Sequence, residues 1–248
     1  MPIKAKGVAE SKCVNWLFGR GLSIGCNLPW SVPAEWRDLA REEKIDRIKA
    51  ALLEEMNKPT IDCTVIRFIL RLLSVHTNEG WRHRFITTNW DYLLQREILD
   101  LRLKVLPSWL ANSHVFHLNG TVENLPDNSN RSPFLLEEAF GTQRVETPEA
   151  NIVYNQIIWD RTFVVVGMSF ECETDRFLLL ALGRAEDDLP IGESSWIVVN
   201  PNRTVLDLSC QRIEKVLPHA SVKPVRGTLS EWLQSGPQEL REWGTLTS

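Results

Sequence analysis

The sequence predicts a doubly wound α/β fold with a mostly parallel sheet of about six or seven strands. Short apolar segments alternate with longer amphipathic ones, which is the pattern of strands joined by helices. Several of the short segments are almost wholly apolar, as strands are when helices cover both faces of their sheet. The chain has 248 residues, of which 43% are hydrophobic and 24% charged, as in an ordinary globular protein.

The expected strands and helices follow from this alternation. Strands are expected at residues 14–18, 84–87, 101–106, 114–118, 163–166, 196–199 and 221–225. Helices are expected between them at residues 33–56, 61–75, 90–100, 148–161, 174–183 and 203–217. A last helix follows Thr228, because Thr-Leu-Ser-Glu is a capping-box pattern.

We expect one domain that spans residues 1–248. Residues 33–80 are long and helical between the first two strands, so they predict a helical insertion or cap on the sheet. Residues 122–133 are polar and rich in Pro and Asn, which predicts a loop, either a surface excursion or a lid over a site.

Charge and cysteine usage narrow the class of protein. The net charge of −4 gives no general attraction to nucleic acid or anionic membranes. The five cysteines are dispersed without a CxxC pair, so we expect no zinc ribbon and a reducing compartment. With neither a signal-peptide pattern nor an apolar run of ~20 residues, a cytoplasmic protein is expected.

In a doubly wound sheet, ligands bind beyond the carboxyl ends of the strands, so the junction after each strand is informative. The first junction is Phe-Gly-Arg-Gly-Leu-Ser-Ile-Gly. Its glycines fit either a structural turn or a close approach to a ligand, and amides at the start of the next helix would favour a diphosphate. The candidate ligand-binding residues here are Gly19, Arg20, Gly21, Leu22 and Ser23.

The second junction is Thr-Thr-Asn-Trp-Asp, at residues 87–91. Locally, the favoured interpretation is that Thr88 or Asn89 caps a helix beginning near Trp90, with Asp91 in its first turn. The alternative is that the Asn89 amide faces the cleft and holds a substrate carbonyl or a water.

Two further junctions carry polar or small residues. In His-Val-Phe-His-Leu-Asn-Gly-Thr, His117 and Asn119 share one face of an extended strand, although a strand histidine is more often a core residue. Val-Gly-Met-Ser and Val-Asn-Pro-Asn each end an apolar strand and suit the ribose and adenine side of a nucleotide, or a plain turn. The candidates in these two segments are Gly167, Met168, Ser169, Asn200 and Pro201.

Taken in order over residues 14–233, these junctions resemble the sirtuin-like family. Residues 18–30 resemble its Gly-Ala-Gly-hydrophobic-Ser turn, with Arg20 in place of Ala. Residues 87–91 resemble its Thr-Thr/Gln-Asn-x-Asp motif, and 115–121 its strand ending in His-Gly-Ser. The resemblance implies a Rossmann-like fold with NAD as substrate or ligand. It assigns nicotinamide or the attacking water to Asn89 and support of that loop to Asp91, with Thr88 among the cofactor contacts.

The chain departs from the family pattern twice. It lacks the four-cysteine zinc ribbon of protein-deacylating sirtuins, so it resembles the zinc-free branch, which includes NAD hydrolases of bacterial anti-phage defence. Asn119 occupies the position of the family's active-site His, and an amide cannot act as a base. His117 lies two residues upstream, about 6.6 Å away along a strand, and is the candidate to substitute as the base, because imidazole can titrate near neutrality.

Three functions follow from these residues. The first is an NAD glycohydrolase activated by a protein partner or homo-oligomer. The second is a sensor or regulatory subunit that binds NAD or ADP-ribose without hydrolysis, because Asn119 replaces His. The third is a subunit that keeps the fold and has lost the ligand. Protein deacylation ranks below all three.

Overall fold

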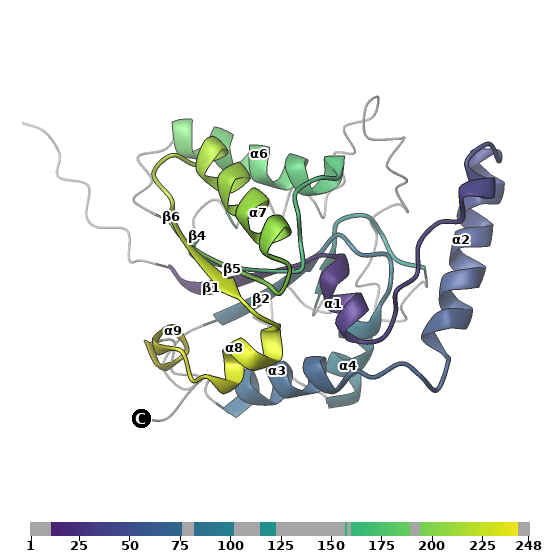
Figure 1. The fold of residues 1–248 in the computed structure, drawn as a ribbon, viewed down its shortest axis with the longest axis horizontal. Helices are drawn as coiled ribbons and strands as arrows, with labels where there is room; N and C mark the ends of the chain where they lie inside the picture. Colours follow the sequence, from purple (N-terminus) through teal and green to yellow (C-terminus); the bar gives the residue numbers. More distant parts are fainter. Residues whose placement is uncertain are drawn as a thin grey trace, which may run out of the picture.

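Within the described residues, six parallel strands form one sheet in the order β3-β2-β1-β4-β5-β6 (Figure 1). The computed structural model describes residues 11–75, 82–101, 115–122, 157, 160–188 and 194–242. The strands are β1 Ser11–Phe18, β2 Arg82–Thr87, β3 Val115–His117, β4 Asp160–Val166, β5 Ser195–Asn200 and β6 Ser221–Arg226. The predicted doubly wound, Rossmann-like α/β fold is confirmed.

Helices cover both faces of the sheet, with α6 and α7 on one side and α3, α4 and α8 on the other (Figure 1). The helical elements are α1 Arg20–Gly25, η1 Ala34–Trp36, α2 Arg41–Met56, α3 Thr64–Val75, α4 Leu93–Leu101, α6 Glu173–Asp188, α7 Arg203–Val216, α8 Leu229–Gln234 and α9 Gln238–Glu242.

The core has one layer on each face because neighbouring side chains of a strand point to opposite sides. Trp16 and Phe18 of β1 pack in the layer that includes α3 and α8. Leu17, between them, packs in the layer of α6 and α7. Each of the three side chains is fully buried, so β1 is the hydrophobic centre of the sheet.

The order of the strands also predicts where a ligand cleft would lie. From β1 the chain proceeds outward to β2 and β3 on one side, and then returns to β4, which pairs with β1 on the other. The connections that leave β1 and β4 therefore diverge, and the crevice between them lies at the carboxyl ends of these strands. This is the switch point at which doubly wound sheets bind their ligands.

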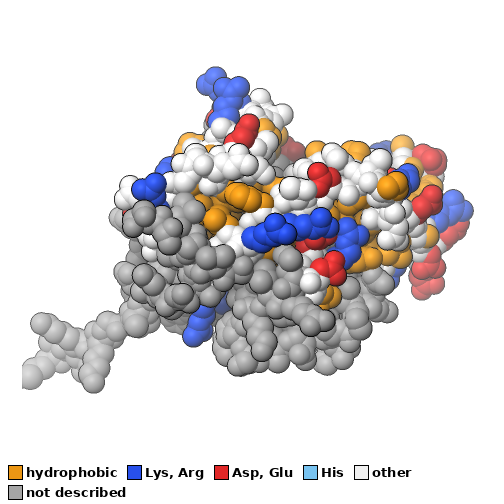
Figure 2. Space-filling model, turned by 90° about the horizontal axis from the view of Figure 1, so that it is seen from below, with side chains coloured by type: hydrophobic (Ala, Val, Ile, Leu, Met, Phe, Trp, Pro, Cys, Tyr) orange, Lys and Arg blue, Asp and Glu red, His pale blue; other side chains and the backbone are white. Residues whose placement is uncertain are grey.

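Helix α2 stands at one end of the sheet, joined to the body by two connecting segments (Figure 1). Its buried residues recur every fourth position, at Lys44, Ile48, Leu52 and Met56. Its outer face is charged, and mixed acidic and basic side chains gather at this end of the molecule (Figure 2). This amphipathic helix lies beyond the carboxyl ends of the strands, and residues 27–62, which contain it, are named the cap.

Two predicted helices differ from the observed ones for clear reasons. The helix expected at 33–56 is divided into η1 and α2, and the ammonium of Lys44 donates to the carbonyl of Arg37 in the break at 2.7 Å. The helix expected to end at Gly183 continues to Asp188. A Cβ at Gly183 would lie 2.6 Å from Cγ1 of Val216, so this glycine permits close packing of α6 on α7.

Other boundaries need correction. Leu101 ends α4 instead of beginning a strand, because the amphipathic pattern of α4 continues through it; residues 102–106 lie outside the described residues. Asp160 and Arg161 belong to β4 and not to a helix at 148–161, because Asp160 pairs in register with Ser11 of β1; residues 148–156, 158 and 159 lie outside the described residues. Of the expected loop at 122–133, only Val122 is described.

The last helix begins as predicted. The Thr228 hydroxyl accepts from the Glu231 amide at 3.2 Å, and the Glu231 carboxylate accepts from the Thr228 amide at 2.7 Å. This reciprocal pair satisfies two amides that an uncapped helix would leave without partners.

A polar cluster joins three strands in the interior. Asn15 of β1 donates to Asp160 of β4 at 2.9 Å, and Arg84 of β2 donates to Asn15 at 2.8 Å and also pairs with Asp160. All three are at most 7% exposed. Burial of the ion pair is tolerated because each partner supplies what the other would lose from water.

None of the described helices combines the length and the apolar character that crossing a membrane requires.

The buried His83 predicts a pH dependence of stability. Burial lowers its pKa from 6.5 to about 4, and its Nδ1 accepts from Nε1 of Trp16 at 3.1 Å. The unfolded chain therefore binds a proton between these pH values that the folded protein does not. The free energy of unfolding should fall as the pH is lowered from 6.5 to 4, by on the order of 3 kcal/mol from this group.

The measurement is denaturant unfolding of wild type and His83→Asn at several pH values. Asn keeps an acceptor for Trp16 and cannot be protonated, so the stability difference between the two proteins should change in favour of the variant as the pH falls. Parallel curves for the two proteins would show that His83 does not titrate in this range.

Candidate functional site

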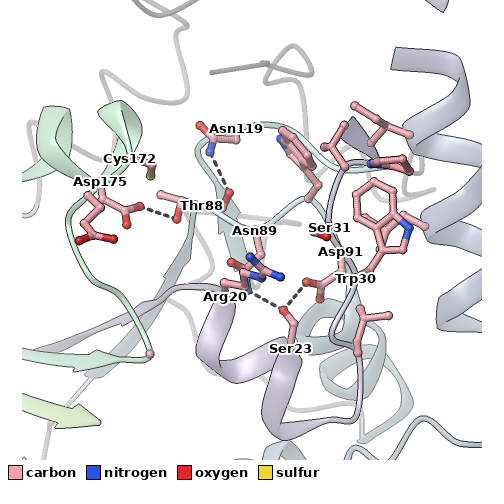
Figure 3. Close-up of a pocket in the computed structure, with 18 of the residues that line it drawn as sticks. Arg20, Ser23, Trp30, Ser31, Thr88, Asn89, Asp91, Asn119, Cys172 and Asp175 are labelled. Carbon is pink, nitrogen blue, oxygen red and sulfur yellow. Dashed lines mark hydrogen bonds between the residues drawn. The ribbon is translucent and has the colours of Figure 1, made fainter. Parts of the chain in front are cut away.

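A cavity of about 730 Å³ lies at the carboxyl ends of the central strands (Figure 3). One wall comes from the junctions that follow β1, β2, β3 and β4, and includes Arg20, Ser23, Thr88, Asn89, Asp91 and Asn119. The opposite wall comes from the cap, with Trp30 and Val32 from the connecting segment and Lys44, Ile48 and Leu52 from α2. The cavity thus has a polar side on the sheet and a largely apolar side on the cap.

Asn89 is held in place at the centre of the polar wall. Its Nδ2 donates to the carbonyl of Gly19 at 3.0 Å and to the Ser23 hydroxyl at 2.9 Å, and that hydroxyl donates to Asp91 at 2.6 Å (Figure 3). Both N–H groups are thereby used. The remaining polar atom of the side chain, Oδ1, is an acceptor that can take an O–H of water or an N–H of an amide.

Asp91 holds the Ser23 hydroxyl that accepts from Asn89. Its second oxygen accepts from the backbone amide of Leu93 at 3.2 Å, so Asp91 satisfies the first amide of α4. The prediction that Thr88 or Asn89 caps this helix is wrong, because α4 begins at Leu93 and both residues precede it by several positions. Burial raises the pKa of Asp91, while the hydrogen bonds from Ser23 and Leu93 oppose that change.

Asn119 lies in the turn after β3 and lines the cavity. Its Nδ2 donates to the carbonyl of Thr88 at 2.8 Å, which fixes the orientation of the amide (Figure 3). The side chain is 7% exposed, and its Oδ1 is buried without a hydrogen-bond partner among the described residues. A buried acceptor of this kind is costly unless a ligand or water satisfies it.

His117 differs from Asn119 in position. It is 2% exposed and pairs in register with Thr87 inside the sheet, and it is not among the residues that line the cavity. The turn at Gly120, with φ +73°, does not bring its side chain to the cavity surface.

Thr88 connects the sheet to α6. Its hydroxyl donates to Oδ1 of Asp175 at 2.8 Å, and Asp175 and Cys172 line the cavity beside it (Figure 3). Neither Asp175 nor Cys172 was predicted from the sequence motifs. In the sequence, Asp175 was indicated only as an acidic residue in the first turn of the helix that follows Val-Gly-Met-Ser.

Lys44 was also missed. It lines the cavity and is 6% exposed. The sequence indicated it by a charged residue in a series of α2 positions, four apart, that are otherwise apolar. A lysine at such a position is seldom buried without a polar partner.

Apart from Gly19 and Gly21, which do not line the cavity, the remaining candidates divide into two groups. Arg20, Ser23, Thr88, Gly167 and Ser169 line the cavity. Leu22 and Met168 are buried in the core, Pro201 is exposed, and Asn200 accepts from the amide of Asn202; none of these four lines the cavity.

The glycines of the first turn serve the packing of backbone on backbone. A Cβ at Gly21 would lie 2.4 Å from Cα of Gly167, and one at Gly19 would lie 2.8 Å from the Gly167 carbonyl. The amides of Gly19 and Gly21 donate to Val166 and Gly167, and that of Leu22 to Gly19. These three amides are already paired within the protein, so they are not available to an anion, whereas the side chain of Arg20 lines the cavity and carries a positive charge.

Among the residues that the structure describes, no group of three or more His, Cys, Asp or Glu side chains could hold a metal ion.

Comparison with known proteins shows what the fold resembles. No family model matches the chain, and no curated protein matches it. Among solved structures, it resembles a Sir2 enzyme from work on the mechanism and regulation of that group, with a TM-score of 0.53, 17% identity and 94% of each chain covered.

Two further Sir2 structures are similar. One is bound to an acetylated peptide, with a TM-score of 0.53, 16% identity and coverage of 96% of this chain and 95% of the other. The second holds a p53 peptide and NAD⁺, with a TM-score of 0.50, 14% identity and coverage of 96% and 95%. At these identities the likeness shows the fold alone, which is a sirtuin-like fold.

Gly21→Ala should destabilise the protein because its new methyl group would overlap the backbone of Gly167. We expect a loss of about 3 kcal/mol in the free energy of unfolding, or roughly 10 °C in Tm. Gly25→Ala is the matched control in the same short helix, since a Cβ there meets nothing within 4 Å. Equal melting temperatures for the two variants would contradict the close approach of the two turns.

Proposed function

We propose that this cavity binds NAD and that the protein hydrolyses its glycosidic bond to release nicotinamide and ADP-ribose. The observation that carries the proposal is Asn89, which lines the cavity and whose two side-chain N–H groups are held by Gly19 and Ser23, so that Oδ1 is the side-chain atom left to accept from a ligand. The likeness of the fold to Sir2 enzymes, one of them with a p53 peptide and NAD⁺, supports it.

The polar wall fits the parts of a dinucleotide. Arg20 lines the cavity and supplies a positive charge for a diphosphate. The buried Oδ1 of Asn119 requires a donor, and a ribose hydroxyl is one. The apolar cap wall, with Trp30, Ile48 and Leu52, suits a flat ring such as nicotinamide or adenine.

The proposed reaction depends more on the orientation of the attacking water than on a strong acid or base. When the glycosidic bond of NAD breaks, nicotinamide leaves as a neutral molecule and positive charge remains on the ribose, so a correctly placed water can attack and release a proton to solvent. Asn89 Oδ1 accepts an O–H of that water and directs its oxygen toward the ribose. Ser23 and Asp91 are positioning residues, because they act by holding Asn89.

The proposal extends to the setting that the resemblance implies: anti-phage defence in a bacterial cytoplasm, with activation by a protein partner or by self-association, and with no zinc required. Turnover of an acylated peptide would instead support protein deacylation.

The first test is calorimetric titration with NAD, followed by chromatography of the same mixture for nicotinamide. Wild type should bind NAD and release nicotinamide, and Asn89→Ala should reduce release at least a hundredfold. Asn57→Ala, at the exposed C-terminal cap of α2, is the control and should match wild type. Absence of NAD binding would leave only a protein that has kept the fold and lost the ligand.

A second candidate is a sensor that binds NAD or ADP-ribose without cleaving it. The observation that favours it is Asn119, an amide at the cavity surface where the resemblance implies a histidine, together with His117 outside the cavity. NAD binding without release of nicotinamide in wild type would support the sensor and overturn hydrolysis.

Asn119→His tests the assignment of this position. A histidine here adds a group that can accept a proton from a ribose hydroxyl, so nicotinamide release should rise by about a hundredfold. Release by the variant should also increase with pH through roughly 6–7, because imidazole is a base only when neutral. If the variant binds NAD as wild type does but gains neither rate nor this pH profile, position 119 is not the site of the missing base.

A further inference from the structure

Two cysteines mark the ends of the segment that forms the cap wall. Cys26 ends α1 and Cys63 directly precedes α3, so residues 27–62 lie between them. This segment contains η1, α2 and the cap residues that line the cavity (Figure 1). Both cysteines are free thiols, with exposures of 0% and 2%.

The two ends of the segment are held together at its base. The amide of Asp62 donates to the carbonyl of Cys26 at 3.0 Å, and Nδ2 of Asn27 donates to the carbonyl of Thr60 at 3.3 Å. The thiols of Cys26 and Cys63 hydrogen-bond to each other. Hydrogen-bonded thiols on adjoining backbone segments need little movement to reach disulfide geometry.

The surroundings of Cys63 favour its thiolate. Nη2 of Arg96 donates to its sulfur at 3.4 Å, and its carbonyl accepts from Arg67, which places Cys63 at the N-terminus of the twelve-residue α3. The hydrogen bond from Cys26 lowers the pKa of Cys63, and Arg96 lowers it further, against burial and the charge of Glu97. A thiolate is the form that reacts with oxidants.

At two of the other cysteines burial dominates, although Arg84 opposes it at Cys13. Burial raises the pKa of Cys13 to about 12 and that of Cys210 to about 11. Among the described residues, the base of the cap therefore has two thiols that hydrogen-bond to each other and an arginine that donates to one of them.

We propose that Cys26 and Cys63 form a reversible disulfide that fixes the cap to the body of the protein. The oxidant is a peroxide. The Cys63 thiolate attacks one peroxide oxygen, the O–O bond breaks, and Cys63 becomes a sulfenic acid. The Cys26 sulfur then displaces its oxygen as water, so that two thiols and one hydrogen peroxide give one disulfide and two waters.

The disulfide would act on the candidate site through α1 and the cap. Cys26 is three residues from Ser23, which holds Asn89, and the loop that the bond closes carries the apolar wall. Reduced protein keeps the base of the cap closed by hydrogen bonds and apolar packing, without a covalent bond. Oxidised protein would hold it covalently, which limits how far the cap can open.

The test uses the full chain and hydrogen peroxide. After oxidation and quenching, the protein is denatured, alkylated and analysed by mass spectrometry with peptide mapping. Wild type should lose two of its five alkylatable thiols and yield one cross-linked peptide pair containing Cys26 and Cys63, both reversed by dithiothreitol. Cys26→Ala and Cys63→Ala should yield no cross-link, whereas the control Cys210→Ala should still lose two thiols.

Full alkylation of Cys26 and Cys63 after oxidation, a cross-link between other cysteines, or conversion of Cys63 to a sulfinic acid without a cross-link would overturn the proposal.

A second readout tests the effect on the cap. Oxidised wild type should melt about 5 °C or more above reduced wild type, because the bond closes a long loop. Trypsin cleavage after the exposed Arg37, Arg41 and Arg47 should slow about tenfold on oxidation, with no change in Cys63→Ala. A disulfide without either effect would show that it does not fix the cap. Neither readout involves NAD, so these outcomes stand apart from those of the proposed function.

Discussion

The contact between the backbones of Gly21 and Gly167 is the constraint on which the candidate site depends. These glycines lie in the turns after β1 and β4, at the switch point of the sheet, and the Gly21 amide donates to the Gly167 carbonyl at 2.9 Å. Because side chains are absent from both positions, α1 can lie directly against the neighbouring turn. Its position then determines where Ser23 and Arg20 lie, and where Cys26 begins the cap.

From this contact the polar wall is built by hydrogen bonds that pass from one strand end to the next. Asn89 is tied to the first turn through Gly19 and Ser23, and the backbone of Thr88 receives the amide of Asn119 from β3. On the other side, the Thr88 hydroxyl reaches Asp175 at the start of α6. Four junctions are thus held in one arrangement, which is the preorganisation that a water-orienting site requires.

The sequence predicted the fold well because its signals were local and regular. Apolar strands such as 163–166 and 196–199 and the capping box at Thr228 fall where expected. Errors arose where a tertiary contact outweighed a local pattern. Gly183 resembled a helix terminator and proved to be a packing position, and Asn89 resembled a cap and proved to face the cavity.

The site was predictable only in part, for a related reason. Junction motifs identified Arg20, Ser23, Thr88, Asn89, Asp91 and Asn119 because residues after parallel strands meet at one edge. The same reasoning wrongly included Leu22, Met168, Asn200 and Pro201. These residues also follow strand ends, but their side chains do not line the cavity. Lys44 and Trp30 come from the cap, and no strand pattern indicates which cap residues turn inward.

The two walls of the cavity differ in how firmly they are held, and this difference bears on function. The sheet wall is fixed by several strands and a chain of hydrogen bonds, whereas the buried ammonium of Lys44 donates to Arg37 within the cap itself. The cap is connected to α1 and α3 at its base, where Cys26, Asn27, Thr60 and Asp62 bring its ends together. Chemical selectivity should therefore reside on the sheet wall, where donors and acceptors cannot adjust. Entry and release of a ligand should be governed by the cap, because displacing α2 would break fewer hydrogen bonds and packing contacts than moving any strand.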